Sequence, residues 1–126
     1  MAYKHEALTR QIIEIFYKVY NSLGYGFLEK VYENALAIEF RKSGLDVTPQ
    51  APIKVIYDQE IVGEYYIDLL VADCVIVEVK AVKTLLKEHE AQLLNYLKAS
   101  KIEVGLLINF GPKPQITRKV FDNHRK

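Results

Sequence analysis

The sequence lacks several features that would assign it at once to a well-known class. Only one of its 126 residues is cysteine and none is tryptophan. A lone Cys74 forms no internal disulfide and no zinc site of the Cys-pair type, so we expect a reducing compartment. The chain has no apolar run near the roughly 20 residues of a membrane span, and its N-terminus has no apolar signal region. We therefore expect a soluble, cytoplasmic protein with no membrane partner.

An excess of charge of one sign is also missing. The 17 Lys and Arg residues nearly balance the 16 Asp and Glu residues, which gives a net charge of +1. This balance excludes a strongly basic nucleic-acid binder and an acidic tail, so any contact with nucleic acid must be local. The three histidines show no spacing typical of a zinc site. Half of the residues are apolar, enough for one hydrophobic core, and we predict a single domain over residues 1–126.

Apolar periodicity predicts three helices. Residues 6–23 carry apolar side chains at steps of three and four, which indicates an amphipathic helix with one face on a core. Two glycines, Gly24 and Gly26, interrupt this pattern, and a second helix is expected at residues 27–43. The same spacing predicts a third helix at residues 86–100.

Alternating β-branched and aromatic residues predict strands between and after these helices. The expected strands cover residues 53–57, 61–71, 75–81, 104–110 and 116–121. Pro49 and Pro52 exclude an interior strand where they occur, because proline has no backbone donor. Short turns at residues 58–60 and 72–74 would join the first three strands into a meander. The predicted fold is α/β in the α+β sense, with two N-terminal helices, the meander, a helix and further strands in a mixed sheet.

Two charged residues lie inside the apolar strand expected at residues 75–81. Side chains alternate across a strand, so Glu78 and Lys80 share one face while Val77 and Val79 share the other. An ionised group among apolar residues is costly unless it is paired or bound to a metal. A solvent-facing ion pair, worth less than ~1 kcal/mol, is the plain alternative. The apolar setting favours a functional site.

The length of the turn at residues 72–74 decides which residue faces Glu78. If this loop has three residues, Val71 pairs with Val75, and counting back places Asp68 opposite Glu78 with Cβ atoms about 4.5–5.5 Å apart. A loop one residue longer or shorter would place Asp68 on the other face of the sheet. The site prediction therefore depends on this turn.

The same register has consequences for the neighbours of the two carboxylates. Tyr66 would lie opposite Lys80. Asp68 and Glu78 would repel each other in an empty site but suit a divalent cation, and hard oxygen ligands indicate Mg²⁺ or Mn²⁺. A two-carboxylate glycoside hydrolase fits less well, because Lys80 lies beside the pair and no tryptophan is present to stack on a sugar.

Three sequence motifs resemble those of a known nuclease superfamily. Asp68 followed by Glu78-Val79-Lys80 resembles the acidic residue and (Asp/Glu)-x-Lys of the PDDExK superfamily, although Ile67 stands where the name of that superfamily implies proline. Residues 26–32, Gly-Phe-Leu-Glu-Lys-Val-Tyr, are similar to the signature of the GxxExxY family. Residues 92–96, Gln-Leu-Leu-Asn-Tyr, resemble the QxxxY motif of RecB-type members. The resemblance implies a restriction-endonuclease-like core.

The resemblance also implies roles for individual residues. Asp68 and Glu78 would hold the metal, with Glu29 as a third acidic group and the backbone carbonyl of Val79 completing the shell. Lys80 would position or deprotonate a water, or neutralise charge on the attacked phosphate. Gln92 and Tyr96, four residues apart on one helix face, would border the site. Glu29 also has a purely structural explanation, because a carboxylate in the first turn of a helix is favoured by the helix dipole.

Tyrosine is abundant, with nine residues in the chain. Tyr25, Tyr65 and Tyr66 lie near the motifs and could stack on nucleic-acid bases, although tyrosine is equally an ordinary half-buried strand residue.

The function that these observations predict is a Mg²⁺-dependent nuclease or nuclease-like phosphodiesterase acting on DNA, with RNA also open as substrate. The alternative is a catalytically inactive nucleic-acid-binding or assembly module that keeps the nuclease fold. Either form could pair as a homodimer through an exposed edge strand or through the helix at residues 6–23.

Overall fold

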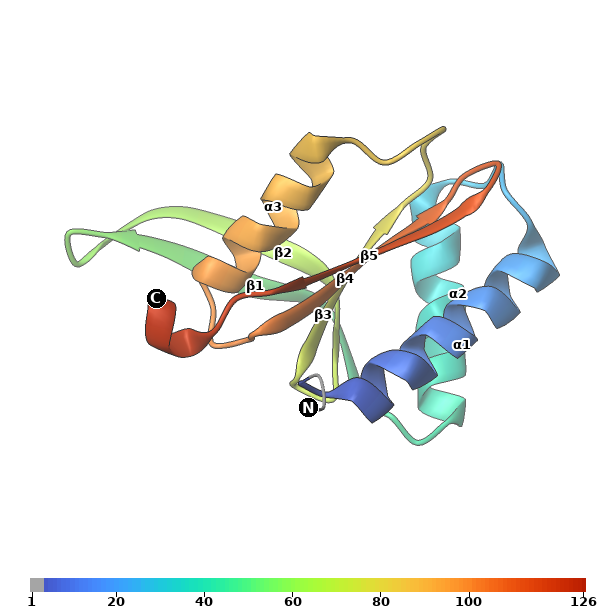
Figure 1. The fold of residues 1–126 in the computed structure, drawn as a ribbon, viewed down its shortest axis with the longest axis horizontal. Coiled ribbons are helices and arrows are strands. Elements are labelled where there is room, and N and C mark those ends of the chain that lie inside the picture. Colours follow the sequence, from blue (N-terminus) through green and yellow to red (C-terminus); the bar gives the residue numbers. More distant parts are fainter. Residues whose placement is uncertain (1–3) are drawn as a thin grey trace.

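The computed structural model describes residues 4–126 as three helices and one five-stranded sheet (Figure 1). In chain order the elements are α1 (Glu6–Leu23), α2 (Glu29–Lys42), β1 (Val47–Tyr57), β2 (Glu60–Val71), β3 (Val75–Lys80), α3 (Lys87–Lys98), β4 (Val104–Phe110), β5 (Pro114–Val120) and a 3-10 turn, η1 (Asn123–Arg125). No helix within residues 4–126 has both the length and the apolar character needed to cross a bilayer.

The sheet is mixed, with its strands in sequential order. β1, β2 and β3 form the expected antiparallel meander, and β5 pairs antiparallel with β4. Only β3 and β4 are parallel, and α3 makes the crossover that a parallel pair requires. This mixed α+β architecture confirms the predicted fold.

Helices cover both faces of the sheet. α1 and α2 pack on one face, where the larger core contains the valines of β3, with Leu106 and Ile108 of β4. α3 packs on the opposite face through Leu93 and Leu97, which contact Ile76 of β3. Figure 1 shows α3 separated from α1 and α2 by the strands. The alternation predicted for β3 is confirmed, because its valines point towards α1 and α2 while Glu78 shares the α3 side with Ile76.

The helix boundaries agree closely with the sequence pattern. α1 matches residues 6–23, and Gly24 ends it with a φ of 68°, in the region that glycine adopts most easily. Gly44, with a φ of 79°, follows the end of α2 in the same way. α2 and α3 are each slightly shorter at both ends than predicted.

The extent of β1 differs from the sequence prediction. The strand begins at Val47 rather than at residue 53, and it contains Pro49 and Pro52. β1 is the edge strand of the sheet, so one side of its backbone has no neighbour and the missing proline donors interrupt no second ladder. The exclusion of an interior strand was therefore correct, while the inferred length was too short.

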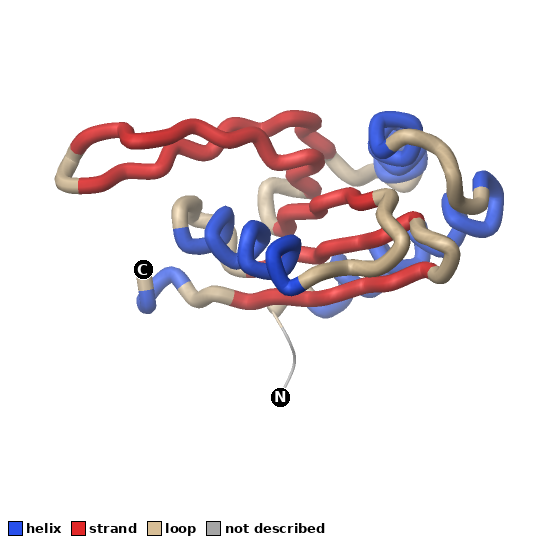
Figure 2. The backbone as a smooth tube through the Cα atoms, turned by 90° about the horizontal axis from the view of Figure 1, so that it is seen from above, coloured by secondary structure: helices blue, strands red, loops and turns tan. Residues whose placement is uncertain are grey.

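The hairpin of β1 and β2 projects from the body of the sheet (Figure 2). Asp58 and Gln59 form its tip with φ values of 50° and 67°, and the register shifts between Val55 and Ile56. Large apolar side chains are exposed around this tip: Ile56, Tyr57, Ile61 and Val62. The end of the hairpin thus extends the sheet beyond β3, β4 and β5.

Candidate active site

The turn between β2 and β3 has the three-residue loop on which the site prediction depends. Ala72 and Asp73 have φ values of 52° and 53°, and the backbone N–H of Cys74 donates to the carbonyl of Val71 at 3.0 Å. Val71 consequently pairs with Val75. The predicted register is confirmed at this point.

The two strands separate at the predicted carboxylates. The β2–β3 ladder runs from Val71 opposite Val75 to Leu69 opposite Val77. At the next position, that of Asp68 and Glu78, backbone pairing between the two strands ends, and carboxylate side chains accept backbone hydrogen bonds instead.

Two hydrogen bonds bridge the place where the strands separate. The backbone N–H of Asp68 donates to Oε2 of Glu78 at 2.7 Å, and the backbone N–H of Val79 donates to Oδ2 of Asp68 at 2.8 Å. Each carboxylate thus satisfies a backbone donor on the opposite strand. β3 itself stays fixed on its other side, where its pairing with β4 continues to Lys80 opposite Asn109.

The predicted opposition of Tyr66 and Lys80 is wrong, because the strands have separated before these residues. Tyr66 pairs instead with Pro52 on β1, and its hydroxyl donates to Glu64 at 2.7 Å. Counting register from the turn holds only as far as the ladder continues.

Both carboxyl groups hold their protons more tightly than usual. Glu78 is only 4% exposed, and burial raises its pKa to about 8, with the neighbouring charge of Asp68 acting in the same direction. Burial also raises the pKa of Asp68 to about 6, and the charges of Glu33 and Glu29 add to this shift. Backbone N–H donors and Lys80 oppose both shifts without cancelling them. A cation beside the pair would favour the ionised carboxylates and so oppose both shifts.

Lys80, Gln92 and Tyr96 lie around the carboxylate pair. Nζ of Lys80 donates to Oε1 of Gln92 at 3.4 Å, which connects β3 to α3. Tyr96 is 7% exposed, and its pKa is raised to about 12, first by burial and then by the charges of Glu78 and Asp68. The structure thus brings together five residues that the sequence singled out.

Two acidic residues in the first half of α2, Glu29 and Glu33, differ in their surroundings. Glu29 is half-buried at the first position of the helix, and its charge raises the pKa of Asp68. Glu33, one turn later, is 7% exposed and raises the pKa of both Asp68 and Glu78. Oε1 of Glu33 accepts from Gln50 Nε2 at 3.0 Å. Glu33 is not among the predicted site residues, although its four-residue spacing from Glu29 places both on one face of the helix.

Tyr32, the last residue of the G-x-x-E-x-x-Y segment, is a core residue. Its ring is fully buried and stacks on Phe110 with centroids 4.0 Å apart. Its hydroxyl donates to the carbonyl of Gly24 at 2.7 Å and accepts from the N–H of Phe27 at 3.1 Å. Tyr32 therefore ties the loop before α2 to the core, and this loop leads directly to Glu29.

A buried polar network, which sequence analysis missed, holds the loop that follows Lys80. Asn109 is fully buried; its side chain accepts from the N–H of Val82 and donates to the carbonyl of Val82, both at 2.9 Å. It also donates to Oε1 of Gln115 at 2.9 Å. Gly111 must lack a side chain here, since a Cβ would lie 2.3 Å from the carbonyl oxygen of Val82. The segment leaving β3 is therefore fixed at both backbone groups of Val82.

The carboxylates provide a donor set that fits a hard divalent cation. Asp68 and Glu78 each use one oxygen for a backbone N–H, and no residue within 4–126 donates a hydrogen bond to Oδ1 of Asp68 or Oε1 of Glu78. Oxygen ligands of this kind suit Mg²⁺ or Mn²⁺. In the described part of the chain, however, no group of three or more His, Cys, Asp or Glu side chains lies close enough to form a complete metal site. Glu29 is thus not gathered with the pair into a three-ligand cluster.

The fold is that of a restriction-endonuclease-like protein. The family model of the PD-(D/E)XK nuclease superfamily matches residues 6–119, and the chain belongs to that superfamily. No curated protein shows significant sequence similarity to it.

A solved structure supports the same fold. The crystal structure of SSO0001 superposes with a TM-score of 0.59 at 13% sequence identity. The match covers 94% of this chain but only 60% of SSO0001, so the chain spans about three-fifths of that protein's length. At this identity the likeness concerns the fold.

Proposed function

We propose that the protein is a Mg²⁺- or Mn²⁺-dependent nuclease acting on DNA, with RNA as a second possible substrate. The observation that carries the proposal is the Asp68–Glu78 pair: two neighbouring carboxylates with raised pKa values where β2 and β3 separate. Membership of the PD-(D/E)XK superfamily supports a nuclease-like activity and a nucleic-acid substrate.

The residues of the site suggest how the metal-binding and catalytic roles would be divided among them. Asp68 and Glu78 would hold the cation through their free oxygens, with Glu29 and the carbonyl of Val79 as further ligands. When bound, the cation would supply electrophilic stabilisation of the phosphate charge that develops during hydrolysis. Lys80 would orient the attacking water or neutralise that charge.

Gln92 and Tyr96 would act from α3. Gln92 accepts the hydrogen bond of Lys80 at 3.4 Å, so it would fix the direction of the ammonium group. Tyr96 is buried beside the carboxylates and stays protonated at neutral pH, because its pKa is about 12. Its hydroxyl would therefore be a hydrogen-bond donor towards a phosphate oxygen. We also propose that residues 26–32, which resemble the GxxExxY signature, contribute to this site through Glu29.

The exposed hairpin tip favours a second candidate, a non-catalytic assembly module that pairs as a homodimer. Tyr57 is 74% exposed and Val62 is 61% exposed, next to the free edge of β1. Exposed apolar edges of this kind promote self-association. We place the protein in the cytoplasm under either proposal, on the basis of its single cysteine.

A cleavage assay separates the two candidates. Purified protein is incubated with labelled single- and double-stranded DNA and RNA in Mg²⁺ or Mn²⁺, beside Asp68→Ala and Lys80→Ala. Cleavage by the wild type that both substitutions reduce by at least about 100-fold supports the nuclease. Cleavage that survives both substitutions overturns the assigned roles. No cleavage, together with a dimer in analytical ultracentrifugation, supports the assembly module.

A further inference from the structure

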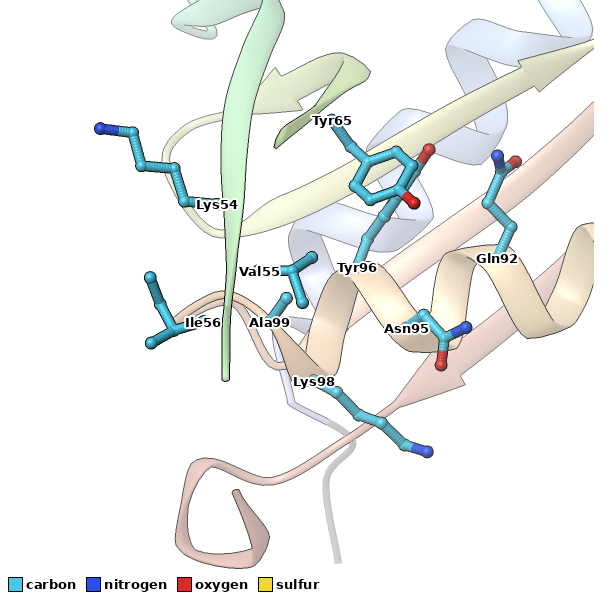
Figure 3. A pocket seen from close by; sticks show the side chains of 9 residues that line it. All are labelled: Lys54, Val55, Ile56, Tyr65, Gln92, Asn95, Tyr96, Lys98 and Ala99. Carbon is cyan, nitrogen blue, oxygen red and sulfur yellow. The ribbon is translucent and has the colours of Figure 1, made fainter. Parts of the chain in front are cut away.

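A cleft lies between the projecting hairpin and α3, beside the candidate active site. Its volume is about 640 Å³, within the ~300–1,000 Å³ usual for small-ligand pockets. One wall comes from β1 and β2 through Lys54 and Tyr65, and the other from α3 through Gln92, Tyr96 and Lys98 (Figure 3). The roles proposed above for Gln92 and Tyr96 account for only one end of this cleft.

A tyrosine ring lies open to the cleft. Tyr65 is 49% exposed, and its ring lies 5.8 Å from that of Tyr96 at an angle of 45°. Figure 3 shows the two rings side by side at the top of the cleft. The half-exposed ring of Tyr65 provides a flat face of the kind on which nucleic-acid bases stack.

The rim of the cleft is positively charged. Lys98, at the end of α3, points its amino group outward from the rim, whereas Lys54 extends from β1 away from the cleft (Figure 3). Lys54 lies across the ladder from Glu64, on the face of the hairpin opposite to Ile53 and Tyr65. Among the described residues Lys98 forms no ion pair, and its Nζ lies 5.6 Å from the ring centroid of Phe121. A cation beside an aromatic floor complements a phosphate backbone that carries stacked bases.

The cleft is continuous with the proposed catalytic residues. Gln92 lines it and contacts Lys80, while Tyr96 lines it and is close enough to Asp68 and Glu78 to respond to their charges. A nucleotide in the cleft would therefore neighbour a phosphate at the carboxylate pair. A base can stack on Tyr65 only when its face is free, which paired bases inside a duplex do not offer.

From this arrangement we infer that the cleft binds an unpaired nucleotide, with its base on Tyr65 and its backbone along Lys98, so that the substrate is single-stranded nucleic acid. This inference rests on the proposed nuclease function, because it names the substrate class of that site. It distinguishes unpaired strands, flaps and frayed ends from intact duplex.

Binding without catalysis tests the inference. Fluorescence anisotropy is measured in EDTA with a labelled oligonucleotide as single-stranded DNA, as single-stranded RNA of the same sequence, and as blunt DNA duplex. The wild type should bind the single strands at least tenfold more tightly than the duplex. Tyr65→Ala should weaken single-strand binding by about 5- to 100-fold, whereas Tyr65→Phe, which keeps the ring, should bind as the wild type does.

A neighbouring tyrosine provides the matched control. Tyr66 lies next to Tyr65 in β2, is 53% exposed and is not among the residues that line the cleft. Tyr66→Ala should therefore leave single-strand affinity within about twofold, and thermal unfolding checks that all variants remain folded. Charge is tested with Lys98→Gln, which should reduce the dependence of binding on salt.

The outcomes separate this inference from the proposed function. Equal affinity for duplex and single strands, or unchanged binding by Tyr65→Ala, overturns the cleft assignment even if the protein cleaves nucleic acid. Binding that depends on Tyr65, in a protein that cleaves nothing in Mg²⁺ or Mn²⁺, supports the cleft and overturns the nuclease activity alone. A similar loss in Tyr66→Ala also overturns the assignment, because it points to the hairpin as a whole rather than the cleft.

Discussion

Glu78 accepts the backbone N–H of Asp68 at 2.7 Å from the neighbouring strand. Asp68 in turn accepts the backbone N–H of Val79 at 2.8 Å. The carboxylates thus satisfy the backbone donors that the separating strands would otherwise leave unpaired, and each keeps one oxygen for another ligand. This arrangement explains how two acidic groups are held close together at the edge of an apolar core.

The stability of the metal-free protein should depend on pH through this pair. The pKa values of Asp68 and Glu78 are about 6 and 8 in the folded chain, above ordinary values of 3.8 and 4.5. Between about pH 4 and pH 8 the folded state therefore binds more protons than the unfolded state, and stability is lost as pH rises. We expect a decrease of at least ~1 kcal/mol, since one pKa unit corresponds to ~1.4 kcal/mol. Urea unfolding in EDTA at pH 5 and pH 8.5 measures it.

Glu78→Gln is the informative variant for this prediction. The glutamine carbonyl still accepts the N–H of Asp68, but the side chain no longer ionises, so the decrease with pH should become smaller. Glu88→Gln, at an exposed position of α3, should keep the wild-type pH dependence. A wild-type stability that is constant or increases over this range would contradict the prediction.

Gln92 should affect catalysis through Lys80. Gln92→Ala removes the acceptor at 3.4 Å and frees the ammonium group, so we expect kcat to fall by about tenfold or more, as for other groups that orient a catalytic residue. Gln92→Glu keeps an acceptor oxygen and should recover part of the rate. Asn21→Ala, an exposed amide in the last turn of α1, serves as control. An unchanged kcat in Gln92→Ala would remove Gln92 from the site.

Asn109 should be important for stability. Asn109→Asp replaces the Nδ2 donor, which serves Val82 and Gln115, with an acceptor that faces two other acceptors. We expect a loss of roughly 1–3 kcal/mol, the usual cost of leaving buried polar groups unpaired. Chemical unfolding measures it, with Asn34→Asp at an exposed position of α2 as control. Equal effects of the two substitutions would show that the network contributes little.

Glu29 and Glu33 of α2 should have different roles in metal binding. If Glu29 is a ligand, Glu29→Gln should weaken Mn²⁺ binding by at least about tenfold. Glu33→Gln should instead lower the pKa values of Asp68 and Glu78, because it removes a charge that raises both. Mn²⁺ binding would then extend to lower pH, with little change at pH 8. Calorimetric titration across pH distinguishes the two patterns, and full affinity in Glu29→Gln would exclude it as a ligand.

Local rules explain how much of the fold and site could be predicted. A three-residue turn at residues 72–74 sets the register of β2 against β3, so the length of this turn is enough to predict that Asp68 lies near Glu78. The separation of β2 from β3 could not be derived from the sequence. The alternation of the strand pattern continues through Tyr66, so it gives no sign that the backbone pairing has already ended. That separation explains the one wrong pairing, Tyr66 with Lys80.

Features that depend on distant segments were beyond sequence reasoning. Asn109 looks like one polar residue in an apolar strand, and its role appears only when the loop at Val82 folds over it. The cleft beside Tyr65 forms because the hairpin projects over α3, which no local pattern indicates. Glu33 could have been predicted from the sequence, because it lies one helical turn from Glu29.

The central claim, that Asp68 and Glu78 form a divalent-cation site, is tested most directly by counting bound Mn²⁺ with electron paramagnetic resonance. The wild type at pH 8 should bind at least one ion per chain, and Asp68→Asn and Glu78→Gln should each weaken that binding by at least about tenfold. Asp73→Asn, in the exposed turn between the same two strands, should bind as the wild type does. Binding that is equal in all four proteins, or absent from the wild type, would contradict the claim.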